Sequence, residues 1–227
     1  MYERFVKRFL DLALSGAALI VLSPILLCLT VVGACAMRGN PFFTQLRPGK
    51  NERIFRLIKF RTMTNAKDAD GNLLPDEKRL IPYGRFLRST SLDELPELLN
   101  ILRGDMSIVG PRPQLVRDMM FMTEEQRSRH LVRPGLTGLA QINGRNAIAW
   151  EEKLQWDLMY IQNGISFWSD VKILWKTVGK VLRRDDTVRD GTVSDVDLGD
   201  WLLQNGRITK EEYARTMAES RRMLQNR

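Results

Sequence analysis

The chain has 227 residues and a formal net charge of +8, with 35 Lys and Arg against 27 Asp and Glu. This length suits one ordinary domain with appendages, and the charge suits nucleic acid, anionic lipid or a phosphate-rich substrate without choosing among them. Two cysteines, Cys28 and Cys35, and a single histidine, His130, argue against a disulfide framework or a zinc site, so any metal must be held mainly by carboxylates, as Mg²⁺ is.

The first long element is apolar, because residues 12–37 carry no charged side chain. As a helix this stretch would be about 39 Å long, which exceeds the roughly 30 Å hydrocarbon core of a bilayer. Its leucine, isoleucine and valine side chains favour insertion by about 4–7 kcal/mol before the polar residues subtract. We therefore predict a membrane segment.

Three arrangements of this segment compete. A cleaved signal is disfavoured because the stretch exceeds an apolar region of about 7–15 residues, although residues 32–35 look like a lipoprotein cleavage box. A helix that returns to the same face is favoured by Ser23–Pro24 near its middle, since proline bends a helix. The positive-inside rule favours it too, because basic residues flank both ends, namely Arg4, Lys7, Arg8, Arg38, Arg47 and Lys50. A kink in an ordinary spanning helix explains the same proline, so the residues alone leave both forms open.

The next segment, residues 40–63, predicts a turn followed by a strand. Alternate residues would share one face of that strand, although the charge on Arg56 interrupts the apolar pattern. These residues are Ile54, Arg56, Ile58 and Phe60. Residues 64–82 are polar and contain Gly71 and Pro75, which predicts a mobile loop.

Helices dominate the middle of the chain. Residues 83–89 predict a short helix or turn, and a stripe of leucines predicts a helix over residues 92–103. Residues 115–130 predict a second helix and residues 150–163 a third. Between these two, residues 133–146 are rich in Gly and Pro and predict a loop.

Residues 165–184 are amphipathic, with aromatic and aliphatic residues at helical spacing opposite a basic side. This pattern suits a helix that lies at the headgroup level of a membrane, and it also suits a core-facing helix of a basic protein. After it the composition changes. Residues 185–200 predict an acidic linker, and residues 201–225 predict one or two small surface helices.

An adjacent acid pair, Asp93–Glu94, opens the leucine-rich segment. Ser91 and Glu94 match a capping box, and acids in a first helical turn complement the helix dipole. Pro96 fits a helix capped from Asp93 better than one capped from Ser91, because proline lacks the N–H that a position past the first turn must donate. Capping is therefore one sufficient explanation of the pair.

A catalytic interpretation draws on the arginines that lie near turns on either side of the pair. Arginine holds phosphate oxygens bidentately, and a carboxylate can attack phosphorus to give an aspartyl-phosphate. A divalent cation and several arginines would neutralise the repulsion between that carboxylate and the phosphate. Asp93 as nucleophile and Glu94 as metal ligand meet this need.

Four segments resemble, in sequence and in order, those of the bacterial sugar transferases. They are "KFRTM" (59–63), "SLDELPELLNILRGDMSIVGPRP" (91–113), "RPGLTGLAQINGRN" (133–146) and "DVKILWKTV" (170–178). That family comprises monotopic phosphoglycosyl transferases, which start glycan assembly on polyprenyl phosphate. The resemblance covers residues 1–184, and the Ser–Pro break belongs to the same pattern, which favours a re-entrant helix.

The resemblance implies a two-step exchange. Asp93 would attack the sugar-bearing phosphate of a nucleotide sugar, usually a UDP-sugar, so that UMP leaves and polyprenyl phosphate then takes the phosphosugar. Glu94 carries over, beside Asp93, as a Mg²⁺ ligand or orienting acid. The residues implied to handle phosphate are Lys59, Arg88, Arg112 and Arg145, with Asp157 as a further polar member.

These expectations describe a mainly α protein with a small β element, in three parts. Residues 1–38 form a re-entrant membrane helix, residues 39–184 a compact cytoplasmic catalytic domain with interfacial amphipathic helices, and residues 185–227 an extension of unassigned role. The expected location is the bacterial inner membrane, with the catalytic domain on the cytoplasmic face. The expected partners are a UDP-sugar, polyprenyl (undecaprenyl) phosphate and membrane lipid, and a homo-oligomer stays open.

A different class also explains the charge and residues 165–184. It is a non-catalytic, membrane-anchored basic protein that binds anionic lipid or nucleic acid. This class leaves the order of the four motifs unexplained, and the basic stretches lack a base-stacking aromatic pattern, so no nucleic-acid partner is expected. The residues do not name the transferred sugar or the glycan pathway.

Overall fold

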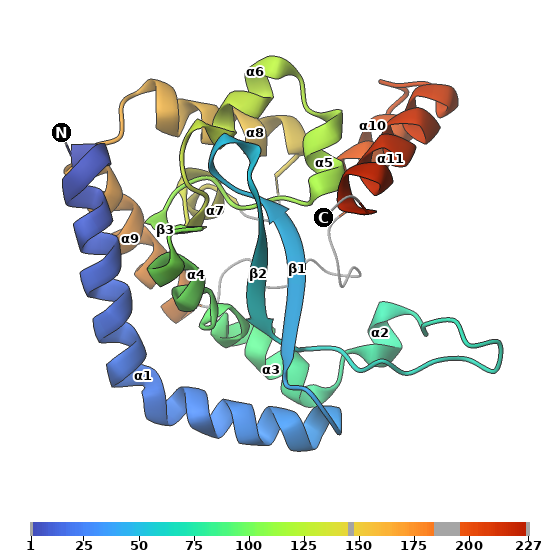
Figure 1. Ribbon diagram of the computed structural model, residues 1–227, viewed down its shortest axis with the longest axis horizontal. Helices are drawn as coiled ribbons and strands as arrows, with labels where there is room; N and C mark the ends of the chain where they lie inside the picture. Colours follow the sequence, from blue (N-terminus) through green and yellow to red (C-terminus); the bar gives the residue numbers. More distant parts are fainter. Residues whose placement is uncertain (1, 145–147, 184–195, 226–227) are drawn as a thin grey trace.

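The computed structural model describes residues 2–144, 148–183 and 196–225. This part of the chain is mainly helical and contains two small two-stranded sheets, which confirms the predicted class. Figure 1 shows the long helix α1 along one side and beneath the molecule, a β-hairpin in the middle, and the last two helices at the opposite corner.

Helix α1 (Lys7–Met37) follows a short π-helical turn, Tyr2–Val6. Within the described residues, this is the helix long and apolar enough to cross a membrane. The protein leaves its side chains largely uncovered, since Ile20 and Val21 are 77% and 74% exposed. An apolar surface of this size needs an apolar environment, so the helix fits a membrane anchor.

Helix α1 changes direction part-way along, and Figure 1 shows its two arms at a large angle. Pro24 lies inside the helix, where its ring displaces one backbone N–H donor. The Ser23 hydroxyl donates a hydrogen bond of 2.7 Å to the carbonyl oxygen of Ile20 in the preceding turn. A proline with such a neighbour is a sufficient physical cause of the bend.

Both arms of α1 are attached to the body by polar contacts. In the first arm, Asp11 is buried and accepts hydrogen bonds from the Ser107 hydroxyl at 3.0 Å and the Ile108 N–H at 2.9 Å. In the second arm, the Leu29 carbonyl accepts a hydrogen bond of 2.9 Å from the Tyr83 hydroxyl. The body therefore holds the helix on both sides of its bend.

The central hairpin pairs β1 (Phe42–Pro48) with β2 (Ile54–Phe60) in antiparallel register, with Phe42 opposite Phe60. The predicted strand is confirmed as β2, in which Phe55 and Leu57 are buried in the core and Arg56 is exposed. The charge on Arg56 marked the solvent side of the strand. Side chains alternate along a strand, so Lys59 lies on the same side as Phe55 and Leu57.

Asn100 completes the free edge of β2. It is fully buried, its side-chain amide donates to the Arg56 carbonyl at 2.8 Å, and its side-chain oxygen accepts from the Ile58 N–H at 3.1 Å. These bonds satisfy backbone groups that an edge strand would leave unpaired. They also fix helix α4, which carries Asn100, beside the strand that carries Lys59.

The second sheet pairs β3 (Ser107–Val109) with β4 (Gly135–Thr137) in parallel. β4 and the short helix α7 (Leu139–Ile142) lie where the Gly and Pro content predicted only a loop. A strand of three residues shows no readable alternation. Gly135 is required here, because a Cβ would lie 2.1 Å from the backbone nitrogen of Gly110.

Short helices surround the two sheets. They are α2 (Asp76–Arg79), α3 (Pro82–Thr90), α4 (Glu97–Arg103), α5 (Val116–Phe121), α6 (Glu124–Arg127), α8 (Trp150–Gln162) and α9 (Phe167–Arg183). Single 3-10 turns occupy Lys50–Glu52, Leu92–Glu94 and Ser128–Leu131. The helices predicted at residues 83–89 and 150–163 are confirmed as α3 and α8.

The single helix predicted over residues 115–130 is wrong, because the chain breaks it at Thr123. The Thr123 hydroxyl accepts from the Gln126 N–H at 3.2 Å, and the Gln126 side chain accepts from the Thr123 N–H at 3.0 Å. This capping box starts the new helix α6.

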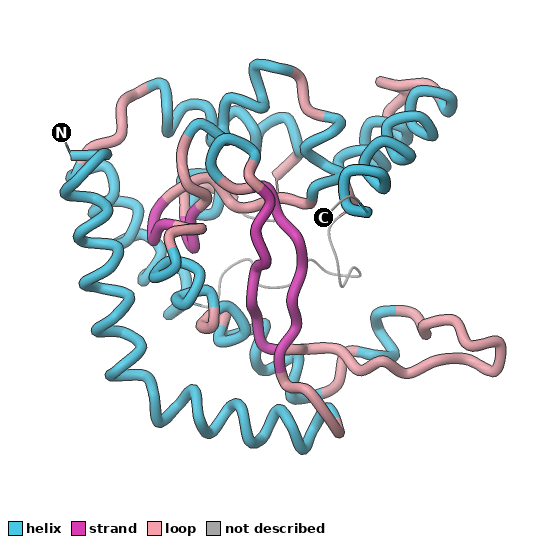
Figure 2. The backbone as a smooth tube through the Cα atoms, in the orientation of Figure 1, coloured by secondary structure: helices cyan, strands magenta, loops and turns pink. Residues whose placement is uncertain are grey.

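The polar segment predicted as a mobile loop contains a paired, extended arm (residues 63–80). Met63 bridges Leu80, Lys67 bridges Leu73, and α2 lies within the returning half. Figure 2 shows the arm projecting from the base of the hairpin. Backbone pairing therefore holds the two halves of the arm together, both at its base and farther out.

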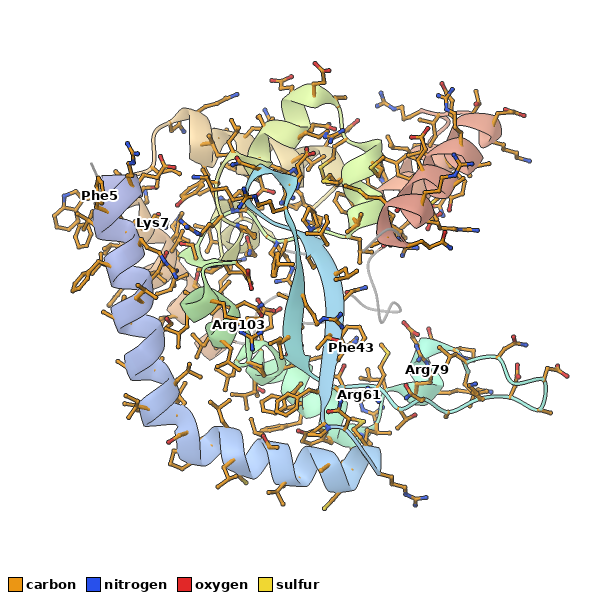
Figure 3. The ribbon with its side chains drawn as sticks, in the orientation of Figure 1. Phe5, Lys7, Phe43, Arg61, Arg79 and Arg103 are labelled. Atoms are coloured by element: carbon orange, nitrogen blue, oxygen red, sulfur yellow. The ribbon has the colours of Figure 1, made fainter. Side chains whose placement is uncertain are left out.

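Helix α9 leaves an apolar row uncovered. Trp168 and Trp175 are 76% and 79% exposed, whereas Ile173 on the other side is buried in the core. Phe5, at the start of the chain, is also exposed, and Figure 3 shows it pointing away from the body. Helix α9 is therefore amphipathic, as predicted.

The C-terminal extension forms two helices, α10 (Leu198–Gln204) and α11 (Lys210–Gln225), which confirms the predicted surface helices. Residues 185–195 of the predicted acidic linker lie outside the described residues. The extension packs on the body, since Leu198 is buried against Met122, Trp150 and Leu154.

Candidate active site

The acid pair lies in the 3-10 turn Leu92–Glu94, between α3 and α4. Ser91 adopts a left-handed conformation, with φ of 55°, and ends α3. The capping interpretation is wrong: helix α4 begins at Glu97, behind Pro96, and neither Ser91 nor Pro96 makes a side-chain cap bond. Pro96 has no N–H to donate, so the regular helix starts after it.

Glu94 is buried between two cations. Its Oε1 atom accepts from Lys59 Nζ at 2.9 Å and from Arg112 Nη2 at 2.8 Å. The charge of Glu94 holds the pKa of Arg112 above its usual value. Burial opposes the charge on Lys59, but the carboxylates around it outweigh burial and raise its pKa. Both cations are therefore fully charged at neutral pH.

Glu97 is a site residue that sequence reasoning missed. It is almost fully buried, and its Oε1 lies 3.0 Å from Lys59 Nζ. Lys59 thus bridges two carboxylates, Glu94 and Glu97. Their spacing of three residues, which places side chains on one helical face, was the signal in the sequence.

Asp93 is partly buried. Burial and the neighbouring charge of Glu94 raise its pKa to about 6, although Lys59, Arg112 and Arg88 oppose the shift. At neutral pH the carboxyl group is ionised, and its environment solvates the charge poorly. A carboxylate in this state is a suitable nucleophile or base.

A pocket of about 740 Å³ opens over the acid pair, which is a usual size for a small-molecule site. Figure 3 labels three of its lining residues: Phe43 on β1, Arg61 at the base of the arm and Arg79 on the arm. Its basic lining residues include Lys59, Arg61, Arg79, Arg88, Arg112 and Arg117. The pocket is therefore suited to a ligand with several negative charges.

Packing of α3 against the end of β2 positions Arg88. The Arg88 Nε donates to the Thr62 hydroxyl at 3.1 Å. Gly84, one turn earlier, permits this approach, because a Cβ there would lie 1.8 Å from the Thr62 carbonyl oxygen. Thr62 is a second site residue that the sequence did not reveal.

Arg47 supports the Pro111–Pro113 turn that carries Arg112. Its guanidinium donates to the Pro113 carbonyl at 3.1 Å and to the Gln45 side chain at 2.7 Å. Burial and the adjacent charge of Arg112 lower the pKa of Arg47 to about 10. Arg47 and Arg112 therefore concentrate positive charge on this wall of the pocket, which favours the binding of an anion.

The structure brings Lys59, Arg88 and Arg112 into one pocket with the acid pair, but it places Asp157 behind them. Asp157 is buried on α8 and accepts two hydrogen bonds from Arg129, at 2.7 and 3.0 Å. Arg129 also donates to the Arg112 carbonyl at 2.6 Å, so Arg129 links Asp157 to the turn that carries Arg112. Arg145 lies outside the described residues.

The carboxylates predicted to hold a metal are those of Asp93 and Glu94, and Oε1 of Glu94 already accepts from Lys59 and Arg112. Within the described residues, no group of three or more His, Cys, Asp or Glu side chains is placed to hold an ion. Mg²⁺ commonly takes one or two carboxylates and completes its shell with waters and substrate phosphates. Two adjacent carboxylates on the wall of a phosphate-suited pocket fit that requirement.

An ionised carboxylate among several cations, on the wall of a pocket of this size, is an arrangement suited to phosphoryl-group transfer. The family model described as "Bacterial sugar transferase" matches residues 2–184. The chain therefore belongs to the bacterial sugar transferase family, which confirms the resemblance found in its motifs and the expectation that it is an enzyme of that family.

Relatives support the assignment. The chain is 50% identical over 178 residues, 78% of its length, to the "Uncharacterized sugar transferase EpsL" of Bacillus subtilis, covering 87% of that protein. It is 40% identical over 77% of its length to the "UDP-glucose:undecaprenyl-phosphate glucose-1-phosphate transferase" of Klebsiella pneumoniae. It is 36% identical over 81% of its length to the "Undecaprenyl-phosphate galactose phosphotransferase" of Salmonella typhimurium. The matches span 39% and 42% of these last two proteins.

Proposed function

We propose that the chain transfers a sugar-1-phosphate from a UDP-sugar to polyprenyl phosphate, which releases UMP and gives a polyprenyl-diphosphate sugar. The observation that carries this proposal is the ionised, poorly solvated carboxylate of Asp93 on the wall of a basic pocket. The relatives named for undecaprenyl-phosphate sugar transfer support the choice of donor and acceptor.

In the first step, a carboxylate oxygen of Asp93 forms a bond to the phosphorus that bears the sugar. The bond from this phosphorus to the bridging oxygen breaks, and UMP leaves with the electron pair. Lys59, Arg88 and Arg112 line the same pocket as Asp93, and they would stabilise negative charge on the reacting phosphate. In the second step, a phosphate oxygen of polyprenyl phosphate attacks the same phosphorus, and Asp93 leaves as a carboxylate.

The rate should fall about tenfold per pH unit below about pH 6, because a protonated Asp93 cannot attack and burial raises its pKa to about 6. An unshifted aspartate would stay ionised down to about pH 4. The measurement is kcat/KM for the donor between pH 4.5 and 8. Enzyme held at pH 5 and returned to pH 7.5 should regain its full rate, which separates titration from unfolding. A flat profile down to pH 4.5 would contradict this assignment.

Asp93 and Glu94 would hold Mg²⁺ together with the donor phosphates, and the ion would neutralise charge on the phosphates. We therefore expect EDTA to abolish UMP release and added Mg²⁺ to restore it. Zn²⁺ should restore it poorly, because the site offers only carboxylates. Full activity in chelator, without added divalent ion, would remove the metal role from Glu94.

The proposed location is the cytoplasmic face of the bacterial inner membrane. The exposed apolar surfaces of α1 and α9 would lie in and on the bilayer, with Trp168 and Trp175 at the headgroup level. Helix α1 would enter and leave on one face, because basic residues flank both of its ends. The body must lie on the cytoplasmic side, because the nucleotide sugars that it uses are in the cytoplasm.

Single cysteines at residues 2 and 40 test this topology in a chain whose Cys28 and Cys35 are replaced by Ala. We expect both sites to resist a membrane-impermeant thiol reagent until the cells are lysed. Replacing Ser23 with Ala and Pro24 with Leu restores a backbone donor and favours a straight helix by about 3 kcal/mol, so this double variant is a candidate spanning form. Labelling of residue 2 from outside in the parent chain, with residue 40 protected, would mean an ordinary span.

The reaction itself is tested by UMP release from a panel of UDP-hexoses and UDP-N-acetylhexosamines, with and without polyprenyl phosphate. At least one donor should give UMP in stoichiometric exchange for a polyprenyl-diphosphate sugar. Absence of turnover with every donor, together with binding to anionic vesicles, would instead favour the non-catalytic lipid-binding class.

A further inference from the structure

The C-terminal extension reaches the pocket. Asp197, which directly precedes α10, lines the same pocket as Asp93, together with Arg117 and Asp118 of α5 and Trp150 of α8. The family match ends at residue 184. This part of the pocket wall therefore combines residues within the family region with one residue beyond it.

Hydrogen bonds on both sides of Asp197 fix its position. The Trp150 indole N–H donates to the Val196 carbonyl at 2.8 Å, and the Leu198 N–H donates to Asp118 Oδ1 at 3.0 Å. The other oxygen of Asp118 accepts from the Leu115 N–H at 3.0 Å. Asp118 is 2% exposed, so a buried carboxylate joins the extension to the pocket wall.

Apolar packing reinforces this attachment. Leu198 is buried with Met122 and Trp150. A Cβ on Gly199 would lie 2.4 Å from the Phe121 ring, so glycine permits the close approach of α10 to α5. The Phe121 ring also stacks on Tyr213 of α11, with ring centroids 5.7 Å apart. These contacts pack the segment that carries Asp197 firmly against α5 and α8.

Asp197 forms an ion pair with Arg117, and the Asp197 side chain is 19% exposed. The pair presents carboxylate acceptors and guanidinium donors side by side with little net charge. The region around Lys59 and Arg112 is suited to phosphate, whereas such a pair matches hydroxyl groups, each of which both donates and accepts. A nucleotide sugar carries hydroxyl groups on its sugar and on its ribose.

We infer that the Asp197–Arg117 pair binds the neutral, hydroxyl-bearing part of the donor, and that the C-terminal extension thereby helps to select it. The inference rests on the proposed function in taking a nucleotide sugar as the ligand. Asp197 accepts a hydrogen bond from a donor hydroxyl and holds Arg117 toward a second one. It is a specificity residue and takes no part in the phosphoryl transfer.

The test is equilibrium binding of UDP, UDP-glucose, UDP-galactose and UDP-N-acetylglucosamine to the full-length protein by calorimetry. Asp197→Ala should weaken the binding of at least one ligand tenfold or more, as expected for a lost hydrogen bond to a charged group. Asp197→Asn keeps the shape and should weaken binding less. Asp200→Asn is the matched control, because Asp200 lies in the first turn of α10, does not line the pocket, and accepts a hydrogen bond of 2.6 Å from Tyr213 of the extension.

The ligand series distinguishes the two sources of hydroxyl groups. Weaker binding of UDP as well as the UDP-sugars assigns the pair to the ribose, and a change confined to the UDP-sugars assigns it to the sugar. In UMP-release assays, Asp197→Ala should raise the donor KM and change the polyprenyl-phosphate KM less than twofold.

Binding of every ligand within twofold of wild type, in both Asp197 variants, would overturn the inference. A wild-type chain that binds none of the four ligands would overturn it as well. Failure of the proposed function gives a different result, in which wild-type protein binds UDP-sugars but releases no UMP. The comparison of ligand binding between wild type and the Asp197 variants still decides the role of Asp197 in that case.

Discussion

Replacing Asp93 with Asn should reduce UMP release by about 10³-fold or more, because an amide is a far poorer nucleophile than a carboxylate. The fold should stay intact, since the substitution keeps the shape of the side chain. The contacts of Glu94 with Lys59 and Arg112 also do not involve Asp93. The measurement is the initial rate of UMP release at saturating donor and acceptor.

Two further observations make this result specific. Wild-type protein incubated with a labelled UDP-sugar, without acceptor, should carry one phosphosugar per chain by intact mass, and Asp93→Asn should carry none. Asp70→Asn, on the exposed arm, is the control and should keep the wild-type rate. Activity of Asp93→Asn within tenfold of wild type would count decisively against a covalent intermediate on Asp93.

Replacing Lys59 with Met should both inactivate and destabilise the protein. Lys59 bridges Glu94 and Glu97, whose side chains are only 11% and 3% exposed. Removing one partner of a buried ion pair leaves an uncompensated charge, at a cost of about 3 kcal/mol. We expect a loss of this size in the free energy of unfolding in detergent, and at least a hundredfold loss of rate.

The pH dependence of this variant follows from the remaining acids. Burial raises the pKa of Glu97 above its unfolded value, so the folded state binds the proton more tightly and stability is lost as pH rises through the folded pKa. The deficit of Lys59→Met should therefore be smaller at pH 5 than at pH 7.5. Adding Glu97→Gln should recover part of the stability and none of the activity. A free energy of unfolding within 1 kcal/mol of wild type at both pH values would contradict the bridging role.

The sequence predicted five residues that share one pocket, because four of them lie in short motifs whose order identifies the family and Arg88 closely precedes one of these motifs; their roles stay predictions. Asp93, Glu94, Lys59, Arg88 and Arg112 all line one pocket. Glu97 was not predicted as a site residue, because the leucines around it indicate an apolar helix face and give no sign of a buried charge. Its pairing with Lys59 depends on the hairpin lying against α4, which no local pattern encodes.

Contacts between distant segments explain the other differences. β1 was missed, and the buried face of β2 was not predicted, because Asn100 and the packing of Phe55 and Leu57 decide which face is buried. The break at Thr123, by contrast, was readable as a Thr-x-x-Gln capping box. The approach of Asp197 to Arg117 joins positions 80 residues apart in sequence, so only the folded chain reveals it.

Asp11 and Tyr83 attach α1 to the body on both sides of its bend. These attachments determine how the position of the protein responds to the thickness of the membrane. A spanning helix must match the hydrocarbon thickness and tilts or distorts the bilayer when it does not. A helix that returns to its own leaflet, with both arms tied to the body, has no second surface to match. In the proposed re-entrant form, the depth of insertion would be set within the protein, and the height of Asp93 above the headgroups would stay constant from a thin membrane to a thick one.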